Sequence, residues 1–168
     1  AAGGSLSPWA GRQMIRFVFA FAIFMTVACT DLRIWMSLAY PAYWISLALL
    51  VAVEVAGRAG LGAQRWIELG PIVLQPSELM KIALILALAR YLHGLQPGDV
   101  SRPAKLLQPL FMIAAPVMLV LLQPNLGTAT LLVLCGATLL FLAGLSWYWI
   151  GSAAAAVAVA VPVAWQFL

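Results

Sequence analysis

Charged residues are scarce in this sequence, and their scarcity excludes a soluble domain. Of its 168 residues, 8% are charged and 65% are hydrophobic, and the mean hydropathy is +1.04. A soluble domain carries about 25% charged and roughly 45–50% apolar residues. No Asp, Glu, Lys or Arg follows Lys105 as far as Leu168. A chain of this composition cannot build a water-facing surface, so we expect an integral membrane protein.

Cysteine, histidine and runs of basic residues are also rare, which excludes further classes of site. The two cysteines, Cys29 and Cys135, lie in apolar runs, and the chain has 1 histidine. A disulfide or a Cys/His metal centre is therefore not expected, and neither is a nucleic-acid partner. Nothing at the first residues resembles a signal peptide. The sequence opens with Ala1 and closes inside an apolar run, so we expect a fragment of a larger protein.

Apolar runs of helical length are what the sequence has in abundance. They exclude the alternating pattern of outer-membrane barrel strands. We predict an all-α, polytopic membrane protein with about six spans of roughly 17–25 residues and no soluble domain. The expected spans lie near residues 15–31, 40–57, 76–93, 106–122, 127–145 and 148–168. Turn-forming residues such as Asp31 and Pro41 are expected at the joints, with tryptophans nearby as interfacial belts require.

One connection, residues 57–75, is long and reads "GRAGLGAQRWIELGPIVLQ". It is too polar and too broken by Gly and Pro to span, so we predict a surface loop that dips back or lies along the interface. Loops of more than about a dozen residues are often functional. Alternating spans place four basic residues on each face, so the positive-inside rule does not orient the chain. The two sets are Arg12, Arg16, Arg58 and Arg65, and Arg33, Arg90, Arg102 and Lys105.

The dipeptide Gln-Pro recurs at residues 75–76, 96–97, 108–109 and 123–124. Pro is favoured in the first turn of a helix, where its missing N–H costs nothing. We therefore predict that the first and last of these dipeptides begin two helices whose N-termini point to the same side. Asn125 is expected to cap the second helix, with Thr128 in its first turn.

Glu78 and Lys81 lie three apart at the start of the first of these helices. A first-turn carboxylate after Pro76 suits the helix dipole, and Lys81 can pair with it. The dipole opposes Lys81, however, and the run that follows is apolar, so a functional role is favoured for this lysine. Two interpretations stay open for Arg65 and Trp66: an interfacial Trp with a snorkelling Arg, or an Arg fork for phosphate. Together these parts suit an amphiphile with an anionic head, such as a lipid-linked phosphate or diphosphate.

Two long motifs carry a resemblance to a known family. "GAQRWIELGPIVLQPSELMKIALILALARY" and "QPNLGTATLLVLCGATLLFLAGLSW" resemble the SEDS family (shape, elongation, division and sporulation) of polytopic peptidoglycan glycosyltransferases. The opening "GGSLSPWAGRQMIRF" and the stretch "DLRIWMSLAYPAY" are more similar to its elongation branch, RodA, than to its division branch, FtsW. The resemblance covers nearly the whole chain. It implies that residues 1–168 are a partial transmembrane domain, roughly the second to seventh of about ten spans.

The resemblance also implies an orientation, a reaction and a location. Loops 1–16, 57–76 and 123–128 would face outward from the bacterial inner membrane. There the enzyme would polymerise lipid II into glycan strands during cell elongation and release undecaprenyl diphosphate. The family's essential aspartate lies beyond Leu168, so none of the five acids present inherits that role. The fragment by itself is expected to be inactive.

By resemblance, Trp66, Glu78 and Lys81 match retained positions that line the outward cavity, and Arg65 joins them as a predicted substrate-binding residue. The predicted structural motif residues are Gln75, Pro76, Ser77, Gln123, Pro124, Asn125, Gly127 and Thr128. The family usually has QPDLGT where this chain has "QPNLGT". Since Asn caps about as well as Asp, a structural role is expected at that position.

The expected partners are lipid II, undecaprenyl diphosphate, a class B penicillin-binding protein and other membrane proteins of the elongation complex. No metal motif occurs, although a divalent cation (Mg²⁺ or Mn²⁺) bridging the diphosphate is compatible with the reaction. Two other functions stay open. One is a transporter or flippase of a lipid-linked substrate, which would also need a cavity with buried cations. The other is a non-catalytic scaffold of the elongation complex.

Overall fold

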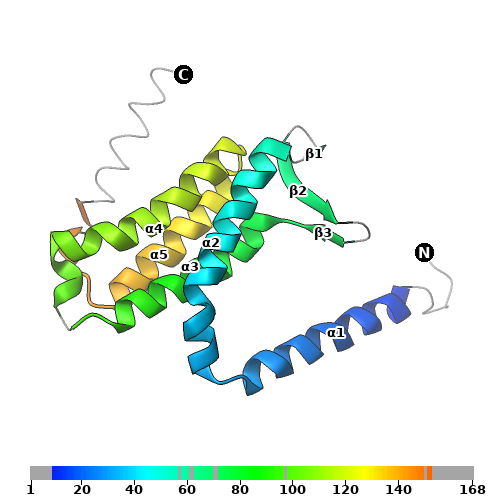
Figure 1. Cartoon of the computed structure of the whole chain (residues 1–168), viewed down its shortest axis with the longest axis horizontal. Coiled ribbons are helices and arrows are strands. Elements are labelled where there is room, and N and C mark those ends of the chain that lie inside the picture. The colour runs from blue at the N-terminus through cyan, green and yellow to red at the C-terminus, as the bar shows by residue number, and fades with distance from the viewer. Residues whose placement is uncertain are drawn as a thin grey trace. The chain divides into compact units, whose positions relative to one another are not determined.

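The computed structural model describes residues 9–56, 58–60, 63–69, 72–96, 98–149 and 151–152. In these ranges the principal elements are five α-helices, one 3-10 helix and three short strands (Figure 1). They are α1 (Trp9–Cys29), α2 (Leu32–Ala56), β1 (Arg58–Gly60), β2 (Ala63–Leu69), β3 (Ile72–Leu74), α3 (Pro76–His93), η1 (Asp99–Ser101), α4 (Pro103–Leu122) and α5 (Leu126–Leu142). The chain divides into two compact units, residues 1–37 and 38–168, each described by itself.

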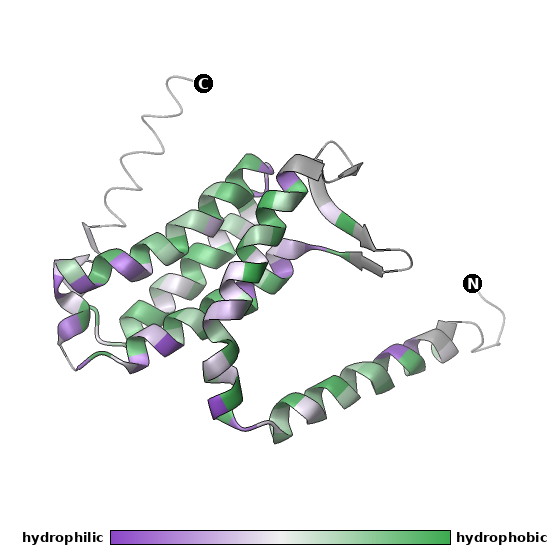
Figure 2. Ribbon diagram, viewed as in Figure 1, coloured by the Kyte–Doolittle hydropathy of each residue, from purple (hydrophilic) through white to green (hydrophobic). Residues whose placement is uncertain are grey.

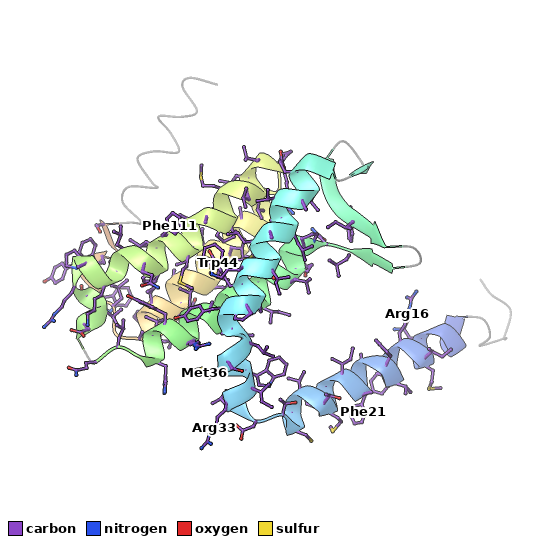
Figure 3. All side chains as sticks on the ribbon, in the orientation of Figure 1. Arg16, Phe21, Arg33, Met36, Trp44 and Phe111 are labelled. Atoms are coloured by element: carbon purple, nitrogen blue, oxygen red, sulfur yellow. The ribbon has the colours of Figure 1, made fainter. Side chains whose placement is uncertain are left out.

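The first unit holds α1 and the start of α2. From residue 13 to residue 29, every residue of α1 is exposed, and Phe17, Phe21 and Phe24 form a run of neighbouring rings along the helix. Figure 3 shows the side chains of α1 projecting around the helix, with Arg16 and Phe21 labelled. Asp31 starts α2 by accepting the backbone N–H of Arg33 at 2.8 Å. An apolar helix exposed all round requires a non-aqueous neighbour, as a membrane-facing helix has.

Helix α2 corrects one predicted joint. Pro41 was expected between two spans, but it lies inside a continuous helix that begins at Leu32. Pro removes one helical hydrogen bond, and helices of membrane proteins tolerate that loss when neighbouring groups satisfy the freed carbonyl. The predicted span near residues 40–57 therefore begins earlier than expected.

The connection between α2 and α3 is a small antiparallel sheet, in the order β1-β2-β3. Trp66 pairs with Arg58 across β1 and β2, and Ile67 pairs with Leu74 across β2 and β3. This corrects the prediction of a surface loop and adds a β element to a chain predicted to be all-α. The physical reason is that β-prone residues such as Trp66 and Ile67 lie in neighbouring segments that pair with one another, so the strands satisfy one another's backbone groups.

Helices α3, α4 and α5 pack against one another and form the core of the second unit. Figure 1 shows α3 and α5 beginning at the end of the bundle that holds the sheet, which we call the sheet end. The opposite end, with η1 and the start of α4, we call the turn end. The most deeply buried large side chains are Leu50, Met80, Leu84, Leu88 and Leu132. The two Gln-Pro helix starts at residues 75–76 and 123–124 thus belong to one end of the bundle.

Helices α4 and α5 approach each other at Gly136. A Cβ atom on this glycine would lie 2.4 Å from the Ile113 Cδ1 atom, which is closer than real carbon atoms pack. The absent side chain therefore sets the distance between these two helices.

Two internal prolines of α4 are each matched by a tyrosine from another helix. Pro109 and Pro116 lack an N–H, so the carbonyls four residues earlier, at Lys105 and Met112, lose their helical partner. The Tyr91 hydroxyl of α3 donates to the Lys105 carbonyl at 2.8 Å. The buried Tyr43 hydroxyl of α2 donates to the Met112 carbonyl at 2.9 Å. These bonds hold α4 to both neighbouring helices at the positions where it is weakest.

Apolar side chains dominate the helices, and hydrophilic ones gather towards their ends and the turns (Figure 2). Two described helices are long and apolar enough to cross a membrane, over Leu32–Glu54 and Pro103–Leu122. Shorter apolar helices cover Gln13–Cys29 and Leu126–Leu142. Most of the predicted last span, from residue 153 onward, lies outside the described residues.

Candidate functional site at the sheet end

The start of α3 carries the Glu78–Lys81 ion pair. The Lys81 Nζ atom lies 2.8 Å from the Glu78 Oε1 atom, across one helical turn. The Lys81 side chain is 24% exposed and the Glu78 side chain is 56% exposed. The Lys81 side chain is thus partly buried while its partner carboxylate is open, an arrangement in which a second anion can reach the lysine.

The local sequence explains why the helix begins here. Gln75 has an extended backbone, Pro76 occupies the first turn, and the Glu78 N–H donates to the Gln75 carbonyl at 3.0 Å. Pro76 and Ser77 are buried, whereas Glu78 on the next position is exposed. The Ser77 hydroxyl is the only buried side-chain polar group that lacks a hydrogen-bond partner in the described part of the chain. The first turn therefore has one face in the core and one facing outward.

The second Gln-Pro dipeptide precedes α5. The Asn125 Oδ1 atom accepts the Thr128 N–H at 3.3 Å, which is the predicted cap. Gln123 is buried, and its Nε2 atom donates to the Leu50 carbonyl of α2 at 3.3 Å. Gly127 is exposed in the first turn of α5. The predicted motif thus has a structural function: it starts α5 and joins the end of α4 to α2.

The remaining predicted residues come from β2. Trp66 is 42% exposed in the middle of this strand, and β2 contacts α3. The backbone of Arg65 lies in the same strand, while its side chain is outside the described part of the structure. The sheet therefore brings the Trp66 strand against the helix that carries Glu78 and Lys81.

This arrangement can bind an anion and stabilise negative charge that develops on it. The Lys81 ammonium and the N-terminal amide groups of the helix act in the same direction on a phosphate-like group. Among the residues that the structure describes, no three His, Cys, Asp or Glu side chains group together as a metal site would require.

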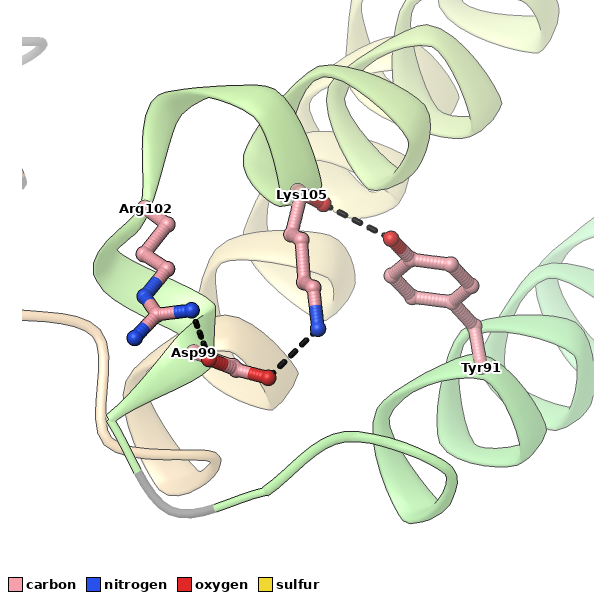
Figure 4. A network of polar contacts seen from close by, with 4 residues as sticks. All are labelled: Tyr91, Asp99, Arg102 and Lys105. Carbon is pink, nitrogen blue, oxygen red and sulfur yellow. Dashed lines mark hydrogen bonds and ion pairs between the residues drawn. The ribbon is translucent and has the colours of Figure 1, made fainter.

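Sequence reasoning missed a second charged network, which lies at the turn end (Figure 4). Asp99 contacts Arg102 at 3.0 Å and also accepts the Lys105 ammonium. The hydrogen bond from Lys105 and the charge of Arg102 hold the pKa of the Asp99 carboxyl below its usual range, against the opposing effect of desolvation. The spacing of acid and bases in "GDVSRPAK" was the available signal.

Comparison with known proteins identifies the family. Residues 3–168 match the profile of the FtsW/RodA/SpoVE family, described as "Cell cycle protein". The chain is 39% identical over 158 residues to the peptidoglycan glycosyltransferase MrdB of Escherichia coli K12, covering 94% of this chain and 42% of that protein. It is 34% identical over 161 residues to MrdB of Helicobacter pylori, covering 94% of this chain and 42% of the relative.

Solved structures agree with this assignment. The RodA rod shape-determining protein of Thermus thermophilus superimposes with a TM-score of 0.74 at 34% identity, over 88% of this chain and 48% of that one. A chain from a peptidoglycan synthase complex gives a TM-score of 0.84 at 35% identity, over 96% of this chain and 48% of that one. The chain thus spans less than half the length of these relatives. On this evidence the chain belongs to the FtsW/RodA/SpoVE family of cell cycle proteins, the SEDS peptidoglycan glycosyltransferases that its motifs resemble.

Proposed function

We propose that the full-length protein containing residues 1–168 polymerises lipid II into glycan strands on the outer face of the bacterial inner membrane. The observation that carries this proposal is the partly buried Lys81 side chain, whose ammonium Glu78 holds at the N-terminus of α3. The relatives are peptidoglycan glycosyltransferases, and this supports the reaction class.

In this reaction the hydroxyl of one sugar attacks the anomeric carbon of another. A carbon–oxygen bond forms, the bond to undecaprenyl diphosphate breaks, and a base takes the hydroxyl proton. Negative charge builds on the departing diphosphate, and Lys81 together with the α3 amide groups stabilises it. Because the Lys81 side chain is partly buried, its attraction for the diphosphate is less screened than that of a fully exposed lysine. Glu78 fixes the direction of the ammonium, and the base is supplied from outside residues 1–168.

The other predicted site residues complete the proposed cavity. Trp66 offers a partly exposed aromatic surface on β2 beside α3. Arg65, its neighbour in the strand, is proposed as a second diphosphate contact because a guanidinium can donate two parallel hydrogen bonds to a phosphate. A divalent cation bound with the diphosphate would supply further stabilisation of its negative charge.

The same proposal assigns a membrane arrangement and partners. The chain supplies about six of roughly ten spans, and the sheet end faces outward. A class B penicillin-binding protein is the proposed partner, because one structural relative belongs to a complex that couples polymerisation to crosslinking.

Polymerisation of purified lipid II by the full-length protein tests this function. We expect Lys81→Ala to lower turnover about 100-fold, the usual effect of removing one charge-stabilising donor, with Lys81→Arg recovering part of it. Arg33→Ala, which removes an exposed basic side chain from the start of α2, is the control and should retain activity. Passage of lipid II across vesicles without any glycan product would instead indicate a transporter. Wild-type turnover in Lys81→Ala would mean that the Glu78–Lys81 pair only stabilises the start of the helix.

A further inference from the structure

The turn end carries a preassembled pair of cations that share a single carboxylate. Arg102 and Lys105 each take a different oxygen of Asp99, so three charged groups leave one net positive charge. Asp99 is nearly buried, whereas the Arg102 side chain is 71% exposed and the Lys105 side chain is 43% exposed. One contact to Asp99 leaves further N–H groups on both cations for another anion.

The backbone beneath these cations is fixed by other bonds. The Tyr91 hydroxyl donates to the carbonyl of Lys105 itself (Figure 4). The Arg102 N–H donates to the Asp99 carbonyl at 3.0 Å. Cations held in place before a ligand arrives lose little freedom on binding it, and this favours affinity.

Exposed aromatic side chains adjoin this cluster. The Ser146 N–H donates to the Ser101 hydroxyl at 3.3 Å, which places the residues after α5 beside η1. The next two residues, Trp147 and Tyr148, are strongly exposed, and Trp147 also contacts Phe141 edge to face at 5.3 Å between ring centroids. Aromatic rings of this kind sit at the level of lipid headgroups.

The neighbouring surface of α4 is apolar. Leu107 and Phe111 are both exposed within its first turns. A ligand at this end therefore meets cations, aromatic rings and an apolar surface, brought together by the Ser146–Ser101 hydrogen bond and by the first turns of α4. These groups match the phosphate, interfacial and acyl regions of a phospholipid.

We propose that Arg102 and Lys105, flanked by Trp147 and Tyr148, bind the phosphate of an anionic phospholipid at the turn end of the bundle. The net positive charge favours an anionic lipid over a zwitterionic one. The exposed rings and the apolar start of α4 favour a membrane lipid over a free phosphate ion. This site is independent of the reaction proposed for the sheet end.

The experiment is a lipid competition with the full-length protein. The protein is placed in nanodiscs of equal phosphatidylglycerol and phosphatidylethanolamine, released into mild detergent, and the lipids that remain bound are counted by native mass spectrometry. We expect phosphatidylglycerol to dominate in the wild type. The preference should fall about tenfold in the double variant Arg102→Gln with Lys105→Gln, and should weaken as salt is raised.

Two further variants keep the result interpretable. The double variant Arg16→Gln with Arg33→Gln removes two exposed positive charges elsewhere and should leave the preference within about twofold. The single variant Arg102→Gln keeps Lys105 on Asp99, so the turn stays paired, and should lower the preference about threefold. Equal losses in both double variants would overturn the site. Binding of inorganic phosphate by the lipid-free protein, with no lipid preference, would overturn its assignment to a phospholipid.

Discussion

Each end of the helical bundle holds a lysine paired with a carboxylate, but the two pairs differ in the structural elements that they connect. At the sheet end, Lys81 and Glu78 belong to successive turns of one helix. At the turn end, Asp99 lies in η1 while its two cations come from the residue before α4 and from its first turn. The first pair links two residues that the helical backbone already holds together. The second fixes how the chain passes from one helix to the next.

The fold needs the turn-end network, which connects two elements, but it does not need the sheet-end pair. A pair three residues apart on a helix adds only about 0.2–0.5 kcal/mol to helix stability. That is too little to explain a cation placed against the helix dipole at the edge of an apolar run. We therefore propose a chemical role for the sheet-end pair and an architectural role for the Asp99 contacts at the turn end. Substitutions can test the two explanations separately.

Exchanging the two sheet-end residues gives the largest expected effect. The double variant Glu78→Lys with Lys81→Glu keeps an ion pair of the same spacing but moves the ammonium to the exposed position. We expect lipid II polymerisation by the full-length protein to fall about 100-fold, with thermal unfolding nearly unchanged. Retained activity would mean that the presence of a pair, rather than the position of its lysine, is what matters.

Tyr43→Phe should give the largest loss of stability among the single changes considered. It leaves the buried Met112 carbonyl without a donor, which costs about 1–3 kcal/mol. In a Pro116→Ala background the helical N–H is restored, so the same change should cost less. The measurement is thermal unfolding in detergent of the four members of this double-mutant cycle. Equal costs in both backgrounds would show that the tyrosine does not compensate for the proline.

Asp99→Asn is expected to affect stability and leave polymerisation intact, the reverse of the sheet-end exchange. We expect the melting temperature to fall by about 2–4 °C at neutral pH. The pKa of Asp99 is lowered in the folded protein, so its contribution is present above the pKa of the unfolded chain and is lost as the pH falls through the folded value. The melting temperatures of wild type and variant should therefore converge below pH ~4. A difference that persists at lower pH would contradict this account.

Substitutions of Asn125 should have the smallest effects and bear on the sheet end alone. Asn125→Ala removes the cap on the Thr128 N–H and should cost about 1 kcal/mol, whereas Asn125→Asp should be close to neutral. The measurements are thermal unfolding and lipid II polymerisation of both variants, compared with the wild type. A gain in activity in Asn125→Asp would show that the charge usual in the family has a function beyond capping.

Local features of the fold could be predicted from the sequence. Pro76 and Asn125 predicted the two helix starts, because a first-turn proline and a capping amide act over only three or four residues. The sheet could not be predicted, because Gly and Pro in residues 57–75 are typical of irregular structure. Its β-prone residues pair with strands close by in the sequence, and that pairing is set by three-dimensional contact rather than by periodicity.

Long-range features could not be predicted in the same way. The internal prolines of α4 can be read from the sequence, but the hydroxyls that donate to the carbonyls they free lie 14 and 69 residues away. The sequence shows that Asp99 is an acid near two bases. The neighbouring residues do not indicate whether such a group forms a solvated turn or a buried network. For the candidate site, the Glu78–Lys81 contact followed from spacing, while the placement of the Trp66 strand beside α3 required the sheet.

The two tyrosines that donate to α4 carbonyls lie earlier in the chain than α4, which bears on how the protein is made. Tyr43 and Tyr91 both precede Lys105 and Met112 in the chain, so α2 and α3 leave the ribosome before α4 does. A copy of α4 that entered lipid alone would carry a bare Met112 carbonyl within its apolar run, which is costly to expose to hydrocarbon, and a bare Lys105 carbonyl nearer its polar end. The donors for both carbonyls are already synthesised when α4 emerges. We therefore expect α4 to enter the bilayer together with the helices made before it.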